Sequence, residues 1–268
     1  MPLHNTTRYA DYHMHTYYSD DCRYPMEKMV QKAISLGLDE IAFTDHVDHA
    51  MSINQIVDYH SYFAEIAMLQ RKYAGKITLK AGVEFGVQSH TIATYNDDAK
   101  NYPFDFIILS NHQIDGKEFW NQVFQKGKTQ AQFQTAYYAA IYNVIQHYKE
   151  YSVLGHLDMI KRYDEYGDYP DSRIMGMVDQ ILELVIKDGK GIELNTSSFK
   201  YGMKDLMPSK ALLRRYYELG GTILTIGSDA HEPTRIGDHF ADARSRLKEI
   251  GFRKFCTFEK MTPIFWDL

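Results

Sequence analysis

The sequence predicts an α/β protein built on a mostly parallel sheet, and three observations carry that prediction. Short apolar runs rich in β-branched residues alternate with helix-like stretches, and this alternation indicates parallel strands joined by right-handed crossovers. At 268 residues the chain is long enough to bury one large core. No repeat, low-complexity tract or Gly/Ser linker divides it, so we expect a single domain over residues 1–268.

Seven apolar runs read as strands. In chain order they are RYADYH (8–13), EIAFTDH (40–46), ITLKAGVEFG (77–86), FDFIILSNH (104–112), YSVLGH (151–156), GIELNTS (191–197) and TILTIGSDAH (222–231). Between them lie helical patterns at residues 24–37, about 53–73, 129–149, 173–188 and 208–219. In the first of these, Pro25 suits the opening turn and Gly37 the helix end. The tail segment FRKFCTFEK (252–260) is a candidate extra strand.

Composition and charge limit the class of protein. The hydrophobic fraction of 44% and the charged fraction of 24% are ordinary for a globular chain. The net charge of −5 argues against a protein that follows nucleic-acid phosphates. Cys22 and Cys256 offer no disulfide framework. The chain shows neither a signal-peptide pattern nor an apolar run near the roughly 20 residues of a membrane span. We therefore expect a cytoplasmic protein that binds neither nucleic acid nor membrane.

Each apolar run ends at a histidine, a carboxylate or an amide side chain. The sixth run ends at Glu193 and Asn195, and the candidate ligands at the others are His13, His15, Asp20, His46, Glu84, His112, His156, Asp229 and His231. The carboxyl ends of parallel strands share one face of a barrel or sheet, so these side chains should converge. A lone H-x-H pair occurs often by chance, but nine such residues exceed what one ion needs. We predict two or three divalent ions, with Zn, Mn and Fe all compatible with imidazole and carboxylate ligands.

Six of these stretches resemble, in order, the motifs of the polymerase and histidinol phosphatase (PHP) family. They are D-x-H-x-H-T-x-x-S-D (11–20), F-T-D-H (43–46), the isolated Glu84, S-N-H (110–112), G-H-L-D (155–158) and G-S-D-A-H (227–231). The resemblance implies a distorted, TIM-like (β/α)7 barrel, in agreement with the seven predicted strands. It also implies three ions: one held by His13, His15, Glu84 and Asp229, a second by Glu84, His112 and His156, and a third by Asp20, His46 and His231.

Two looser motifs are similar to those of the histidinol-phosphate phosphatase branch of the family. They are SNHQIDGKEFW (110–120) and ELNTSSFKYG (193–202). This similarity implies a metal-dependent phosphomonoesterase that hydrolyses L-histidinol phosphate to L-histidinol and phosphate in histidine biosynthesis. The expected partner is thus a small phosphate ester, and the sequence leaves a homo-oligomer open.

The difficulty of the reaction explains why a metal cluster is needed. Enzymes accelerate phosphomonoester hydrolysis by up to ~10²¹-fold, whereas one general acid or base supplies roughly 10²–10⁴-fold. We predict that a hydroxide bridging two ions attacks phosphorus in line. Asp229 or a histidine near the third ion, such as His231, would protonate the leaving alkoxide. With Glu84 as a bridging ligand, Asp229, His231 and Glu84 are the candidate catalytic residues.

The phosphate group also needs protein cations. Arg162, just past the fifth strand, is the first candidate, followed by Arg235 and Lys200. Each has the alternative of being a solvated surface charge. Ser198 and Asn195 are further candidates for substrate contact, and loop capping is the competing interpretation. Asp158 has two readings as well, a partner that orients His156 or a helix cap.

Two alternative functions would use the same predicted metal site. A PHP phosphoesterase acting on nucleotides or oligonucleotides would need a basic groove with stacking aromatics, and the acidic net charge opposes it. A non-catalytic, polymerase-associated metal-binding module would normally show vacant ligand positions or extra domains. The sequence shows neither, so an enzyme is the leading hypothesis.

Overall fold

Seven parallel strands form an almost closed barrel in the computed structural model, which describes residues 7–49 and 57–268. In spatial order they are β1 (Ala10–Asp11), β2 (Glu40–Phe43), β4 (Thr78–Gly86), β5 (Phe106–Ser110), β8 (Val153–Leu154), β9 (Gly191–Asn195) and β10 (Leu224–Gly227). The two edges meet where Tyr12 N donates to Ile226 O at 3.0 Å. Each of the seven predicted runs contains one of these strands, and the predicted barrel is confirmed.

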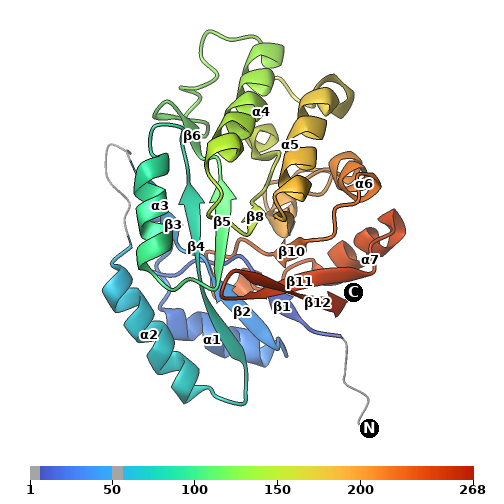
Figure 1. The fold of residues 1–268 in the computed structure, drawn as a ribbon. Coiled ribbons are helices and arrows are strands. Elements are labelled where there is room, and N and C mark those ends of the chain that lie inside the picture. The colour runs from blue at the N-terminus through green and yellow to red at the C-terminus, as the bar shows by residue number, and fades with distance from the viewer. Residues whose placement is uncertain (1–6, 50–56) are drawn as a thin grey trace.

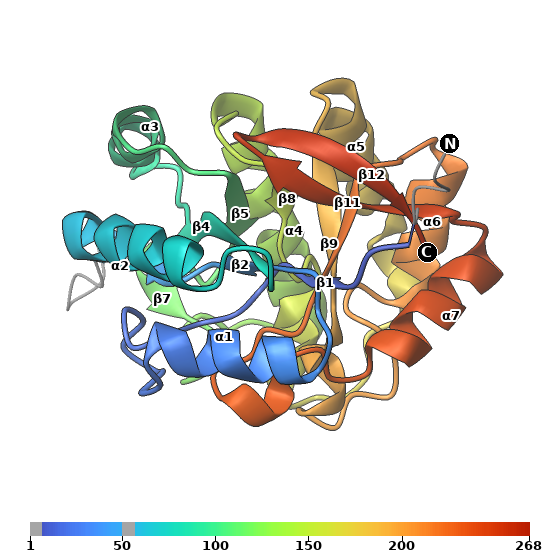
Figure 2. The ribbon, with the colours of Figure 1, turned by 90° about the horizontal axis from the view of Figure 1, so that it is seen from below.

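Helices surround the strands, as Figures 1 and 2 show. The described residues form α1 (Met26–Ser35), α2 (Tyr59–Lys72), α3 (Ile92–Asn101), α4 (Gln130–His147), α5 (Met175–Lys187), α6 (Lys210–Glu218) and α7 (Phe240–Ile250). The five predicted helical patterns correspond to α1, α2, α4, α5 and α6, although residues 53–56 of the second pattern lie outside the described residues. Helices α3 and α7 were not predicted. In α3 only Tyr95 is buried, which leaves little apolar periodicity to read.

The strands are buried on both faces, as parallel barrel strands should be. In β4 every residue after Thr78 is buried. One face packs against the helices and the other fills the barrel, so the apolar runs are continuous rather than alternating. A capping box between Thr129 and Gln132 sets the start of α4, the longest helix in the described part of the chain.

A C-terminal hairpin closes the amino end of the barrel. It consists of β11 (Lys254–Glu259) and β12 (Thr262–Asp267), which pair antiparallel with each other and do not join the barrel sheet. Phe258 N donates to Tyr12 Oη at 2.7 Å, and Lys260 N donates to the Asp105 carboxylate, just before β5, at 3.0 Å. The predicted extra strand is thus β11. The hairpin leaves the carboxyl ends of the strands as the open end.

Two small additions lie near the carboxyl ends of the strands. β3 (His46–Val47) extends the sheet by pairing with the end of β4, and β6 (Gln113–Ile114) pairs with β7 (Lys117–Glu118) just after β5. Both place polar residues close to the end of a barrel strand. None of the helices formed by residues 7–49 and 57–268 is long and apolar enough to cross a membrane.

Candidate metal centre

Glu84 lies at the centre of a cluster of imidazoles. It is fully buried in β4. One carboxylate oxygen, Oε1, lies 2.7 Å from His156 Nε2 and 3.0 Å from His112 Nε2. The other, Oε2, lies 3.1 Å from His13 Nε2 and 3.3 Å from His46 Nδ1. One carboxylate therefore faces four histidines from four different strand ends, as the predicted bridging role requires.

Asp229 forms a second point of convergence. It follows β10, and its Oδ1 lies 3.3 Å from His15 Nε2 and 3.8 Å from His13 Nε2. Its backbone has a positive φ of 53°, and that of His156 is 21°. Positive φ is uncommon outside glycine, and such strain tends to gather where a side chain must be aimed. The first two predicted ligand sets are thus brought together in space.

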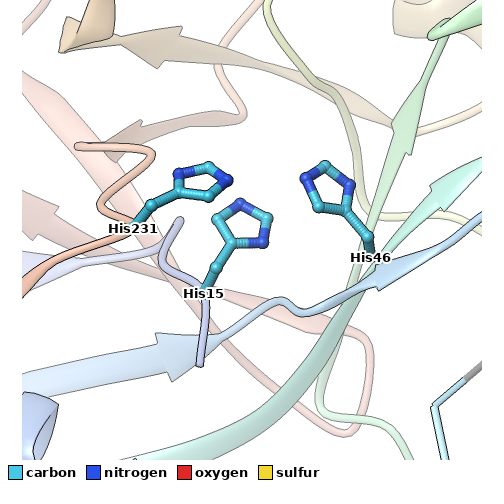
Figure 3. Close-up of side chains that lie close together, drawn as sticks. All are labelled: His15, His46 and His231. Atoms are coloured by element: carbon cyan, nitrogen blue, oxygen red, sulfur yellow. The ribbon is translucent and has the colours of Figure 1, made fainter. Parts of the chain in front are cut away.

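The third predicted set gathers around His15. Figure 3 shows the rings of His15, His46 and His231 close together, with His15 between the other two. The ring centroids of His15 and His46 are 4.3 Å apart, and those of His15 and His231 are 4.1 Å apart. The nearest carboxylate contact comes from Asp21, whose Oδ2 is 2.9 Å from His231 Nε2 and 3.8 Å from His46 Nε2. The predicted ligand Asp20 lines the same cleft.

The donor atoms fit divalent ions. Four groups of three His, Asp or Glu residues place one ligand atom each within 4.8 Å of one another. His15 Nε2 and His46 Nδ1 are buried and lie 3.3 Å from the carboxylates of Asp229 and Glu84. Among the residues that the structure describes, neither nitrogen has a hydrogen-bond partner of suitable geometry. Lone pairs that converge without a hydrogen bond between them are what the ligands of a shared ion require.

Polar groups behind the rings orient them. His13 Nδ1 lies 2.6 Å from Glu193 Oε1, and His112 Nδ1 lies 3.1 Å from Asp48 Oδ2. His15 Nδ1 lies 3.1 Å from the hydroxyl of Ser19. These partners engage the outer nitrogen of each ring and turn Nε2 towards the centre, the usual arrangement around histidine metal ligands.

The charges in the cluster depend on one another. Burial disfavours ionisation of Glu84, but three neighbouring histidines outweigh it and hold the pKa of the carboxyl group well below its ordinary value. Burial likewise opposes protonation of His13, yet Glu193 and two further carboxylates raise its pKa well above the ordinary value. For His15, burial and the adjacent His231 lower the pKa well below its ordinary value. Ions that enter the centre must displace protons from some of these rings, so binding should be pH-dependent.

A cleft of about 480 Å³ opens over the cluster. Beside the metal-ligand candidates, its lining includes Glu118, Trp120, Arg162, Lys200 and Tyr201. The Arg162 guanidinium stacks 3.8 Å from the centroid of the Tyr201 ring and donates to Ser197 Oγ at 2.8 Å. Arg162 Nε is buried without a hydrogen-bond partner among the described residues. A guanidinium held in the lining of the cleft, next to a metal centre, can bind an oxyanion.

The remaining predicted phosphate contacts fall outside the cleft lining described by residues 7–49 and 57–268. Arg235 pairs with Asp238 at 3.0 Å and with Glu232 at 3.5 Å, so its charge is engaged within its own turn. Ser198 is fully buried. Asn195 is also buried and donates to Glu193 and, at 3.4 Å, to Asp229. Asn195 thus bonds to carboxylates in the protein interior, and its contact with substrate stays a prediction.

Asp158 plays neither of its two predicted roles, orienting His156 or capping a helix with its side chain. Its Oδ2 accepts from Lys161 Nζ at 2.9 Å and from Ser209 N at 3.0 Å. It makes no side-chain cap at the 3-10 helix that follows (Met159–Tyr163), and the described contacts include no hydrogen bond to the His156 ring. Its carboxylate instead ties this short helix to the segment before α6.

Sequence reasoning missed Asp21, Asp48 and Ser197 as residues of the centre. Asp48 stands two positions after His46, which is the spacing that puts two side chains of an extended segment on one face. Asp21 is the immediate neighbour of Asp20, so only the path of the turn after β1 decides which carboxylate faces the histidines. For Ser197 no signal distinguishes it from the adjacent Ser198.

Comparison with known proteins agrees with this geometry. The PHP domain model matches residues 11–197. Histidinol-phosphatase of Lactococcus lactis is 33% identical over 262 residues, covering 94% of each chain. A probable histidinol-phosphatase of Clostridium acetobutylicum is 27% identical, over 91% of this chain and 96% of that protein.

A solved structure shares the fold over nearly the whole chain. It is histidinol phosphate phosphatase of Lactococcus lactis in complex with zinc, L-histidinol and phosphate, with a TM-score of 0.90 and 31% identity, covering 96% of this chain and 99% of that one. The family model spans the strand ends from His13 to Glu193. The chain belongs to the PHP domain family.

Proposed function

We propose that this protein is a histidinol-phosphatase, which hydrolyses L-histidinol phosphate to L-histidinol and phosphate and so serves histidine biosynthesis. One observation carries the proposal: a cleft in which Arg162 and Lys200 stand beside a cluster of convergent histidines and carboxylates. The Lactococcus lactis relative, with the same fold over 96% of this chain, binds zinc, L-histidinol and phosphate.

Two or three divalent ions, with Zn, Mn and Fe as the candidates, would be held by His13, His15, Glu84 and Asp229, by Glu84, His112 and His156, and by His46, His231 and Asp20 or Asp21. When bound, these ions would supply Lewis-acid charge and lower the pKa of water in the site. The residues around them have separate tasks. Glu84 holds the imidazoles in one array, and Arg162 presents donors to the phosphate oxygens.

Other residues in the lining of the cleft suit a cationic, aromatic alcohol. Glu118 and Trp120 line the wall that β7 and the following turn provide. A carboxylate can pair with the ammonium group of histidinol, and an aromatic ring offers a face to its imidazole. The acidic side chains Asp20, Asp21, Asp48 and Glu118 also line the cleft. They would repel a polyanion, and this charge favours a small phosphate ester over an oligonucleotide as the substrate.

Phosphate release by the metal-reconstituted protein tests the proposal. L-Histidinol phosphate, a nucleoside monophosphate and an aryl phosphate should be compared at equal metal loading. We expect a kcat/KM for histidinol phosphate higher by about 10³-fold, which is about 4 kcal/mol of differential transition-state binding. Similar kcat/KM values for all three substrates would indicate a general phosphatase and would contradict a role in histidine biosynthesis.

Arg162→Gln should lower kcat/KM by about 10²–10³-fold, the usual effect of removing a charged donor to a developing oxyanion. Metal content should be measured alongside the kinetics, because Arg162 Nη2 also lies 3.7 Å from Oδ2 of the metal-ligand candidate Asp229. Arg235→Gln is the matched control, since its charge is paired within its own turn. Equal kinetics of the two variants would exclude Arg162 from phosphate binding.

A further inference from the structure

Glu193 occupies an unusual place for a carboxylate. It lies in β9 between β8 and β10, and none of its surface is exposed. A buried carboxylate is costly unless donors surround it. Three donors do so here: the His13 ring at 2.6 Å, the backbone N–H of His156 at 2.9 Å and the Asn195 side-chain amide at 3.2 Å.

The two histidines that Glu193 contacts are also two of the histidines that approach Glu84. His13 Nε2 lies 3.1 Å from one oxygen of Glu84, and His156 Nε2 lies 2.7 Å from the other. Together His13, Glu84 and His156 form one of the groups that could hold an ion. Glu193, which is not among the residues that line the cleft, therefore contacts two of the three members of that group.

We propose that Glu193 is a positioning residue for this ion site, acting on His13 through its ring and on His156 through its backbone. A carboxylate can only accept, so the proton of the His13–Glu193 hydrogen bond lies on Nδ1. That tautomer leaves the lone pair of Nε2 free for the ion. At His156, the acceptor holds the N–H of a residue whose φ is 21°, a conformation that needs support.

Neighbouring glycines make room for this arrangement. A Cβ on Gly227 would lie 2.4 Å from Glu193 Oε1 and 2.4 Å from His13 Cβ. Any side chain there would therefore separate the pair. A Cβ on Gly155 would lie 2.5 Å from Ile108 and 3.6 Å from Glu193 Oε2. Gly227, at the end of β10, thus lacks a side chain where the Glu193 carboxylate reaches His13, whereas Gly155, just after β8, mainly makes room for Ile108.

The variant Glu193→Gln distinguishes a residue that positions metal ligands from one that only stabilises the fold. Glutamine keeps the size of the side chain but has one acceptor oxygen for the three donors, and an amide N–H₂ turned towards His13 favours the wrong tautomer of that ring. We expect affinity for the weakest-held ion to fall by about 10- to 100-fold, as for other groups that orient metal ligands. Chelator competition measures this affinity. The visible spectrum of the Co²⁺-substituted protein should change as well, because it reports the ligand geometry.

Glu40→Gln is the matched control. Glu40 is also a buried strand carboxylate, but its partners are Arg8, at 2.6 Å, and the Tyr12 hydroxyl. We expect this variant to lose thermal stability with unchanged metal affinity and Co²⁺ spectrum. If Glu193→Gln behaves in the same way, Glu193 only stabilises the barrel and the proposal is overturned.

Should Glu193→Gln not fold, Glu193→Asp provides a second variant. Aspartate keeps the charge with a shorter side chain, so we expect a smaller loss of metal affinity in the same direction. An unchanged affinity in Glu193→Asp would then overturn the proposal.

A double-mutant cycle with His13→Asn adds a second test. If Glu193 acts through His13, the two losses of metal affinity should not add. Additive losses would contradict an action of Glu193 through His13.

The inference rests on the metal centre of the proposed function, yet the two can fail separately. A protein that binds ions but does not hydrolyse histidinol phosphate would refute the function alone, whereas unchanged ion binding in Glu193→Gln would refute the positioning role alone.

Discussion

Replacing Glu84 by glutamine should lower kcat/KM by at least about 10³-fold and should empty part of the metal centre. Four imidazole nitrogens lie within 3.3 Å of this one carboxylate, two at each oxygen. Glutamine presents one oxygen and an amide N–H₂, so at least one pair of histidines would face a donor in place of a ligand. The charge stabilisation that an ion gives to a transition state is worth several kcal/mol, and each 1.36 kcal/mol is a tenfold change in rate.

Metal content and activity should be measured together for Glu84→Gln. We expect fewer ions per chain after exhaustive dialysis, together with the loss of activity. The protein should remain folded, because glutamine keeps the size of the side chain and the buried histidines can lose their protons once the carboxylate charge is gone. Glu40→Gln again provides the comparison for losing a buried carboxylate elsewhere in the barrel. Full metal content with full activity would show that Glu84 bridges nothing.

The positions of the metal-ligand candidates were predictable because the barrel itself aligns them. A parallel barrel brings every strand end to one face, so a histidine after β5 and an aspartate after β10 must converge even though 117 positions (229 − 112) separate His112 from Asp229. The apolar runs mark those strands clearly, since they are buried on both faces. Hence the strand count and the open end of the barrel follow from the sequence.

The partners of these ligands were harder to predict because they depend on side-chain direction. Glu193 lies in a strand, and only the tertiary structure shows that its oxygens meet the ring of His13 and the backbone of His156. Arg162 and Arg235 look alike in sequence, each just past a strand. The first stacks on Tyr201 over the cleft, and the second is neutralised by carboxylates of its own turn. Such differences come from packing rather than from periodicity.

Asp229→Asn is the second substitution with a large expected effect, a loss of about 10³-fold in kcat/KM. Asp229 faces four positively charged or ligating groups: His15 at 3.3 Å, His231 at 3.5 Å, Arg162 at 3.7 Å and His13 at 3.8 Å. Ser197 Oγ also donates to it at 3.1 Å. Burial favours the neutral acid, but His13 and the other neighbours outweigh it and hold the pKa of Asp229 well below its ordinary value. A carboxylate so strongly held in its charged form suits ion binding better than proton donation.

The leaving group can separate these two roles of Asp229. Protonation of the leaving oxygen matters for an alkoxide and little for an aryl oxide, so a lost general acid should harm an alkyl phosphate far more. If Asp229 acts as a ligand, Asp229→Asn should lower the rates of histidinol phosphate and an aryl phosphate by similar factors. His231→Asn serves as the paired variant, since His231 Nε2 lies beside Asp21 at the cleft and is the other predicted acid. A loss confined to the alkyl ester in one variant, measured at full metal loading, would assign proton transfer to that residue.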